Sequence, residues 1–118
     1  MDRSAHQRVN EAFDLLRNAR RRYILYYLRN ESATVDLDEL AAQIADWEAG
    51  ATKTNSDETT VESVRTTLRH SHLLKLANAG IITYEPNPGH IELVEAHETN
   101  QILDEIPIGN DPRQAADD

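Results

Sequence analysis

The sequence predicts a mainly α-helical domain that carries one β-hairpin. Apolar residues recur at helical spacing in successive segments between residues 8 and 79. The last and longest segment ends at Gly80, and two runs rich in β-branched residues follow at 81–85 and 90–94. A two-stranded hairpin is unstable alone, so it must pack against the helices.

Length and composition fit one domain with a modest core in a chain of 118 residues. There is no cysteine, which excludes disulfides and thiolate metal sites. The N-terminal residues MDRSAHQR contain no apolar run like that of a secretion signal, and no segment is apolar for the length of a membrane span. We therefore expect a cytoplasmic protein without membrane contacts.

Acidic residues dominate the charge, with 21 Asp and Glu against 12 Lys and Arg and a net charge of -9. Only Lys53 and Lys75 are lysines. An acid-rich, lysine-poor composition is typical of proteins from a salt-saturated cytoplasm, where carboxylates keep the surface hydrated. It indicates a halophilic archaeal source; the alternative is an ordinary acidic protein that avoids nucleic acid. The arginines concentrate in residues 1–30, which gives the protein a basic pole.

The first two predicted helices span residues 8–17 and 19–30. The i, i+3, i+4, i+7 spacing of Val9, Ala12, Phe13 and Leu16 predicts the first. Asn18 is a suitable N-cap for the second, which is apolar on most sides and is expected to be central in the core. Its tyrosines are interpreted as core residues rather than as a stacking platform for single-stranded nucleic acid; they are Tyr23, Tyr26 and Tyr27.

A third helix is predicted over residues 37–49. Asp36 is its expected N-cap, with Glu39 completing a capping box, and Gly50 is expected to end the helix. Its buried stripe consists of Leu37, Leu40, Ala41, Ile44 and Ala45, with Trp47 near the end. Residues 50–57 are predicted to form a loop.

The fourth helix, 60–79, is predicted to begin after a second capping box of Thr59 and Glu62 and to end at Gly80 as the C′ residue. Its apolar stripe is Val61, Val64, Leu68, Leu73, Leu76 and Ala77. Strands 81–85 and 90–94 follow, joined by the turn Pro86-Asn87-Pro88-Gly89.

This order of four helices and a hairpin predicts a winged helix-turn-helix domain over residues 1–95. A short helix is expected at 96–106, where Ile102, Leu103 and Ile106 have helical spacing. Residues 107–118 are expected to form a disordered acidic tail.

The sequence offers no catalytic constellation, and we expect neither an enzyme nor a bound cofactor. It has no phosphate-binding glycine loop and no nucleophile elbow. His70 and His72 point about 200° apart on a helix and cannot share a metal there. Two interpretations of His90 and His97 are a metal-sensing role and a position facing solvent or DNA. The second is favoured, so no metal site is predicted.

The face of the fourth helix opposite its apolar stripe carries the predicted DNA contacts. It presents Arg65, Thr66, Arg69 and His70. Arginine can donate two hydrogen bonds to guanine, and threonine or histidine can reach a base edge or a phosphate in the major groove. The alternative is that these arginines only solvate the helix.

The run Arg20-Arg21-Arg22 places three cations at the start of a helix, where they oppose its dipole. One interpretation is a clamp on DNA phosphates. The other is pairing within the protein, with acids such as Glu11, Asp14 or Glu48, or with the acidic tail. Arginine fits either, because its planar fork can bind two acceptor atoms.

Three segments, 15–28, 35–48 and 64–93, resemble the small winged-helix domains of unknown function from halophilic archaea. The matching patterns are LLxNxRRRYxLYYL and HxHLxKLxxAGxI. The second is also similar to ArsR-type repressors, although their metal-binding cysteines are missing. The resemblance implies a winged-helix fold and transcriptional regulation. Two departures are the long link at 50–57 and a hairpin turn without Lys or Arg.

The resulting prediction is a sequence-specific regulator that binds double-stranded DNA as a homodimer, because two copies double the number of bases read. The expected dimer interface consists of Val9, Phe13, Ile102, Leu103 and Ile106. The alternative is a winged-helix interaction module that binds a partner regulator or the transcription machinery.

Overall fold

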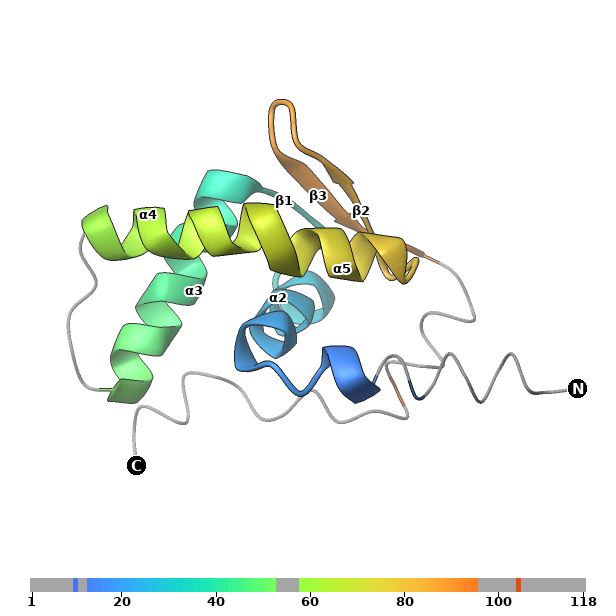
Figure 1. Ribbon diagram of the computed structural model, residues 1–118, viewed down its shortest axis with the longest axis horizontal. Helices are drawn as coiled ribbons and strands as arrows, with labels where there is room; N and C mark the ends of the chain where they lie inside the picture. Colours follow the sequence, from blue (N-terminus) through green and yellow to red (C-terminus); the bar gives the residue numbers. More distant parts are fainter. Residues whose placement is uncertain (1–9, 11–12, 53–57, 96–103, 105–118) are drawn as a thin grey trace, which may run out of the picture.

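The computed structural model describes residues 10, 13–52, 58–95 and 104. In the described part, the helices are α2 (Ala19–Asn30), α3 (Leu37–Thr52), α4 (Glu58–Thr67), the π-helical turn η1 (Leu68–His72) and α5 (Leu73–Asn78). The strands are β1 (Thr34–Asp36), β2 (Ile82–Glu85) and β3 (His90–Leu93). α4, η1 and α5 form one continuous rod, here called the long helix, which crosses α2 and α3, while the β2–β3 hairpin projects to one side (Figure 1).

The three strands form an antiparallel sheet in the order β1-β3-β2. β1 was not predicted. It pairs with β3 through Val35 and Ile91, which are far apart in the chain. A segment of three residues is too short to show a sequence pattern that predicts such pairing. With β1 included, the order of helices and strands is that of a winged-helix-like fold, and the predicted fold class is confirmed.

The boundaries of α2 are those predicted. The side chain of Asn18 accepts a 2.9 Å hydrogen bond from the backbone N–H of Arg20, so the predicted N-cap is confirmed. The predicted end of α3 was wrong: the helix includes Gly50 and continues to Thr52, so only 53–57 separate it from α4. One glycine in a helix costs about 1 kcal/mol and does not by itself stop it.

The long helix was predicted at 60–79 and runs from Glu58 to Asn78, so Thr59 lies inside it rather than at its N-cap. The predicted helix lacked the π turn. The backbone N–H of Leu73 bonds to the carbonyl of Leu68, five residues back. That extra residue lets Leu68 and Leu73 both face the core, which an uninterrupted α-helix does not allow at a spacing of five.

Gly80 ends the long helix as predicted. Its φ of 78° is in the left-handed region, and the N–H of Ile81 bonds to the carbonyl of Leu76 at 3.1 Å. The next residues enter β2 directly. At the other end of the hairpin, the Gly89 carbonyl accepts a 2.8 Å hydrogen bond from the N–H of Leu37, the first residue of α3. The hairpin is thus held at both ends by the helices.

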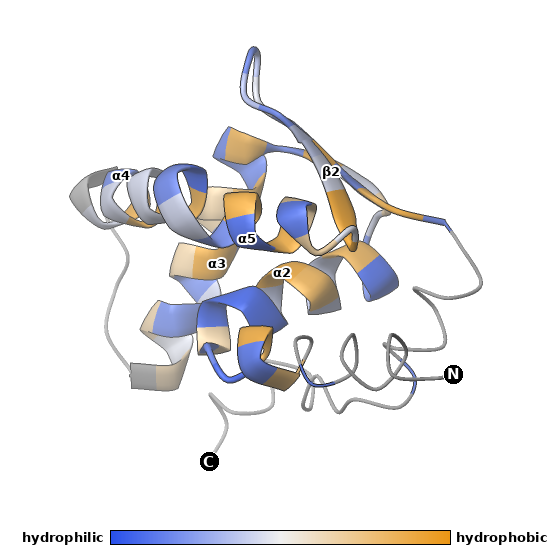
Figure 2. Ribbon diagram, turned by 45° about the vertical axis from the view of Figure 1, so that its right-hand side comes forward, coloured by the Kyte–Doolittle hydropathy of each residue, from blue (hydrophilic) through white to orange (hydrophobic). Residues whose placement is uncertain are grey.

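The core lies between α2, α3, the long helix and the sheet, and apolar segments of the helices face this interior (Figure 2). Each large aliphatic side chain buried there contributes about 1.5–3 kcal/mol of transfer free energy. Trp47 is buried, and Tyr23 and Tyr26 pack against it edge to face at centroid distances of 5.9 and 5.8 Å. The tyrosines are therefore core residues, as expected. The largest fully buried side chains are Ile24, Leu25, Leu28, Leu40, Ile44, Val64, Leu68, Leu73, Leu76 and Ile91.

None of the helices in the described ranges combines the length and the apolar character needed to cross a bilayer.

Candidate nucleic-acid interface

The outer face of the long helix carries an exposed ridge, which we define as Thr66, Arg69 and His70. All three were predicted to face outward, and all three do. Thr66 belongs to the end of α4, whereas Arg69 and His70 belong to η1. On the opposite side, Val64 and Leu68 are fully buried. Within the described residues, neither Arg69 nor His70 forms a hydrogen bond or an ion pair, so their polar atoms are open to a ligand.

Arg65 lies beside the ridge but is paired within the protein. Its Nη1 is 3.0 Å from Oδ1 of Asp38, and its Nη2 is 3.4 Å from Oε1 of Glu62. Its side chain is 39% exposed, and both acids are more exposed still. Exposed ion pairs contribute little free energy, so an incoming phosphate or base can exchange with them.

The arginines of the 20–22 run all bond within the protein. Arg20 forms a bidentate salt bridge with Glu48, in which Nε donates to Oε2 at 2.6 Å and Nη2 donates to Oε1 at 3.0 Å. Arg21 donates from Nη1 to the carbonyl of Leu15 at 3.0 Å. Arg22 donates from Nη1 to the carbonyls of Leu16 and Arg17 at 2.7 and 3.0 Å. Intramolecular pairing, including the expected acid Glu48, is what the geometry shows for this run.

These contacts explain why three cations lie in the first turn of α2. Residues 13–15 are helical, and the accepting carbonyls belong to Leu15, the last of them, and to Leu16 and Arg17, which follow directly. Cationic donors are favourable where a helix ends with unpaired carbonyls. The cations oppose the dipole of α2, as the sequence indicates, but they also stabilise the turn before it, which the sequence pattern did not reveal.

His72 is a buried histidine, which the sequence pattern did not predict. It is 5% exposed, and its Nδ1 accepts a 3.1 Å hydrogen bond from Nε of Arg21. Burial lowers the pKa of His72 to about 4, and the nearby charges of Arg21, Arg20 and Lys75 add to this effect. Because Nδ1 is an acceptor, the neutral ring carries its proton on Nε2. The five-residue gap between Leu68 and Leu73 was the sequence signal that helical phase changes here.

The hairpin offers no cation for a DNA backbone. Its tip residues Pro86, Asn87 and Pro88 are exposed, and the flanking Glu85 is exposed and acidic. His90 lies at the start of β3, directly after the turn, with Nε2 3.8 Å from Oε1 of Glu92. Among the residues that the structure describes, no cluster of three or more histidines or acids could hold a metal ion.

The predicted dimer interface falls mostly outside the described residues. Val9, Ile102, Leu103 and Ile106 lie there, as do the tail at 107–118 and, apart from Asp104, the helix predicted at 96–106. Of the helix predicted at 8–17, residues 8, 9, 11 and 12 are outside the described ranges, whereas 10 and 13–15 are helical and 16–17 form a turn. Phe13 is described, and 47% of its surface is exposed. A large aromatic ring left this open is a candidate contact for another chain.

The fold and the ridge define a small winged-helix-like domain whose long helix exposes polar side chains on its outer face. A family model described as "Domain of unknown function (DUF7344)" matches residues 13–92, which is most of the chain. The protein belongs to that family, as the sequence resemblance to a family of unknown function led us to expect. No curated protein and no solved structure gives a significant match to the chain.

Proposed function

We propose that the protein is a sequence-specific regulator that binds double-stranded DNA and inserts the long helix into the major groove. The observation that carries this proposal is the exposed ridge. Arg69 and His70 extend from the middle of a helix that is fixed from behind by a fully buried stripe, so they can enter a groove without disturbing the core.

The chemistry of the ridge fits a duplex. The Arg69 guanidinium can donate two hydrogen bonds to the acceptors of guanine, and the Thr66 hydroxyl or the His70 ring can reach a neighbouring base edge or phosphate. Arg65 adds a phosphate contact when it exchanges its exposed acids for DNA. Arg20 and Arg22 then contribute by shaping the domain rather than by clamping phosphates, since Arg20 is paired with Glu48 and Nη1 of Arg22 bonds to two backbone carbonyls.

The proposal includes a homodimer in the cytoplasm of a halophilic archaeon. The acidic, lysine-poor composition supports the source, and exposed Phe13 supports a contact between copies on the side of α2. One domain of this size reads few base pairs, so two copies are needed for tight specificity.

A protein-interaction module is the second candidate, and one observation favours it. Leu74 lies on the long helix and is 46% exposed, and the hairpin tip carries no positive charge. An exposed apolar side chain suits a protein partner better than a phosphate backbone.

The test uses duplexes selected from a random pool by the purified protein, with affinity measured by fluorescence anisotropy. Arg69→Ala should weaken binding to the selected duplex by about tenfold or more, since one bidentate base contact contributes about 1–3 kcal/mol. Arg29→Ala removes the same charge from the far end of α2, where Arg29 pairs with Asp104, and is the matched control. If no duplex is enriched, or if both variants lose affinity equally, DNA reading by the ridge is wrong. If Leu74→Asp alone then removes binding of a cellular protein, the interaction module replaces it.

A further inference from the structure

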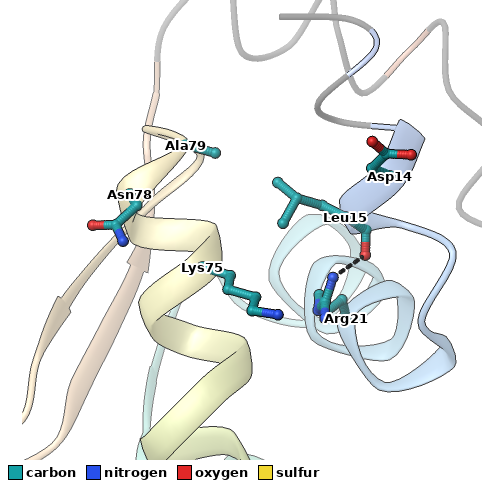
Figure 3. Close-up of a pocket in the computed structure, with 6 residues that line it drawn as sticks. All are labelled: Asp14, Leu15, Arg21, Lys75, Asn78 and Ala79. Carbon is teal, nitrogen blue, oxygen red and sulfur yellow. Dashed lines mark hydrogen bonds between the residues drawn. The ribbon is translucent and has the colours of Figure 1, made fainter.

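A shallow pocket of about 510 Å³ lies between the turn at 13–15 and the end of the long helix (Figure 3). Lys75 of α5 and Arg21 of α2 point toward each other across it, and the Leu15 side chain extends between the two elements. The lining residues are Asp14, Leu15, Arg21, Lys75, Asn78 and Ala79. Pockets of this volume hold small organic ligands.

The two cations in this pocket have no acidic partner among the described residues. Nε and Nη1 of Arg21 donate to His72 and to the Leu15 carbonyl, which are both neutral acceptors. Nη2 of Arg21 and the ammonium group of Lys75 make no hydrogen bond or ion pair to any described residue. By contrast, Arg20 and Arg29 each pair with a carboxylate.

The surroundings make this concentration of positive charge unusual. The whole chain has a net charge of -9, so acids to pair with these cations are abundant. Asp14 is the one acid in the lining, and its Oδ1 is 3.8 Å from Nε of Arg17. In the view of Figure 3, Asp14 lies at the far end of the pocket from Lys75. Arg21 is half-buried and Lys75 is exposed. Two facing cations repel each other, and an anion between them removes that repulsion.

We propose that this pocket binds the phosphate or carboxylate group of a small anionic molecule. Nη2 of Arg21 and the ammonium of Lys75 hold its oxygens, since guanidinium and ammonium donors form charge-assisted hydrogen bonds with such groups. Leu15 and Ala79 offer apolar contact to the rest of the molecule. The site goes beyond DNA binding, because none of its residues belongs to the exposed ridge, yet it joins α2 to the end of the helix that carries the ridge.

Inorganic phosphate is the first probe, added at constant ionic strength while backbone amide signals are followed by NMR. We expect a saturable shift centred on Arg21, Leu15 and Lys75.

Lys75→Gln should weaken phosphate binding about tenfold, because it removes one charge-assisted contact. Asp14→Asn should strengthen it about twofold to threefold by removing a nearby negative charge. Arg29→Gln, with the same change in net charge, should leave it within about twofold. Arg21 is not replaced, because it also bonds His72 and the Leu15 carbonyl.

A shift that grows without saturation, or equal weakening by Lys75→Gln and Arg29→Gln, would overturn the proposal. Citrate in the same titration distinguishes the ligand classes: competition with phosphate shows that carboxylates share the site. Affinity for a selected duplex distinguishes a free small molecule from a DNA backbone as the source of the phosphate group. We expect Lys75→Gln to leave duplex affinity within about twofold, as for a free small molecule. If duplex affinity falls and phosphate competes with DNA, the small-molecule assignment is overturned in favour of a backbone phosphate. The phosphate titration is independent of whether any duplex is bound.

Discussion

The Nε of Arg21 donates a hydrogen bond of 3.1 Å to Nδ1 of His72, which is 51 residues away in the chain. This contact joins the start of α2 to the π turn in the middle of the long helix. The same guanidinium bonds the Leu15 carbonyl and lines the pocket beside Lys75. Arg21 therefore helps to set the position of the long helix against the helices behind it.

The buried His72 predicts a loss of stability in acid. Its pKa is lowered from 6.5 to about 4 in the folded protein, so below pH 6.5 the unfolded chain binds a proton that the folded chain does not. The free energy of unfolding should therefore fall as the pH drops from 6.5 toward 4, by about 3 kcal/mol at the full extent of this shift. Chemical denaturation of the wild type and of His72→Asn at pH 7 and at about pH 4.5 measures it. The variant should lose clearly less stability between the two pH values, and equal losses would contradict the assignment.

Arg21 and Arg17 are predicted to differ in their contribution to stability although both are arginines of one segment. Arg21→Leu removes hydrogen bonds to His72 and to the Leu15 carbonyl, and should cost about 2 kcal/mol. Arg17 has a side chain that is 83% exposed and a long 3.8 Å contact with Asp14, so Arg17→Leu should change stability by less than about 0.5 kcal/mol. Urea denaturation of both variants tests this difference. Similar values would mean that the contacts of Arg21 contribute no net stability.

The local features were predictable because neighbouring residues determine them. The bounds of α2, the Asn18 cap, the Gly80 stop and the hairpin all follow from spacing and turn chemistry, as does the exposure of the ridge. β1 was missed because its strand character comes from pairing with β3, and the burial of His72 was missed because it depends on the π turn and on Arg21. For Arg20, the sequence left open whether it binds DNA phosphates or a carboxylate of the protein. Its partner Glu48 is 28 residues away, so the pairing depends on the tertiary fold.

Two ion pairs should differ in strength, and the difference bears on Arg65 as a DNA contact. The Arg20–Glu48 salt bridge is bidentate, and both side chains are 27% exposed. A double-mutant cycle with alanine should therefore give a coupling free energy of about 1 kcal/mol. The Arg65–Asp38 pair is more exposed and should give less than about 0.5 kcal/mol. A coupling for Arg65–Asp38 as large as that of Arg20–Glu48 would show that Arg65 does not exchange readily to DNA.

Replacing each of the two glycines with positive φ by alanine should distinguish two causes of lost stability, backbone strain and steric crowding of the added Cβ. At Gly80 the φ is +78° and an added Cβ meets nothing within 4 Å, so Gly80→Ala should cost about 1 kcal/mol. At Gly89 the φ is +110° and the Cβ would lie 3.2 Å from Cβ of Leu37, so Gly89→Ala should cost about 3 kcal/mol. Thermal and chemical unfolding of both variants gives the comparison, and a larger cost at Gly80 would contradict the packing of the hairpin against α3.

The most direct test of DNA reading by the ridge is to map where the protein binds its own genome, in the wild type and in the Arg69→Ala variant. The account predicts a limited set of enriched sites that share a sequence motif in the wild type. It predicts that Arg69→Ala loses these sites while remaining folded and present at normal levels. No enriched motif in the wild type, or the same sites at the same strength in the variant, would contradict it.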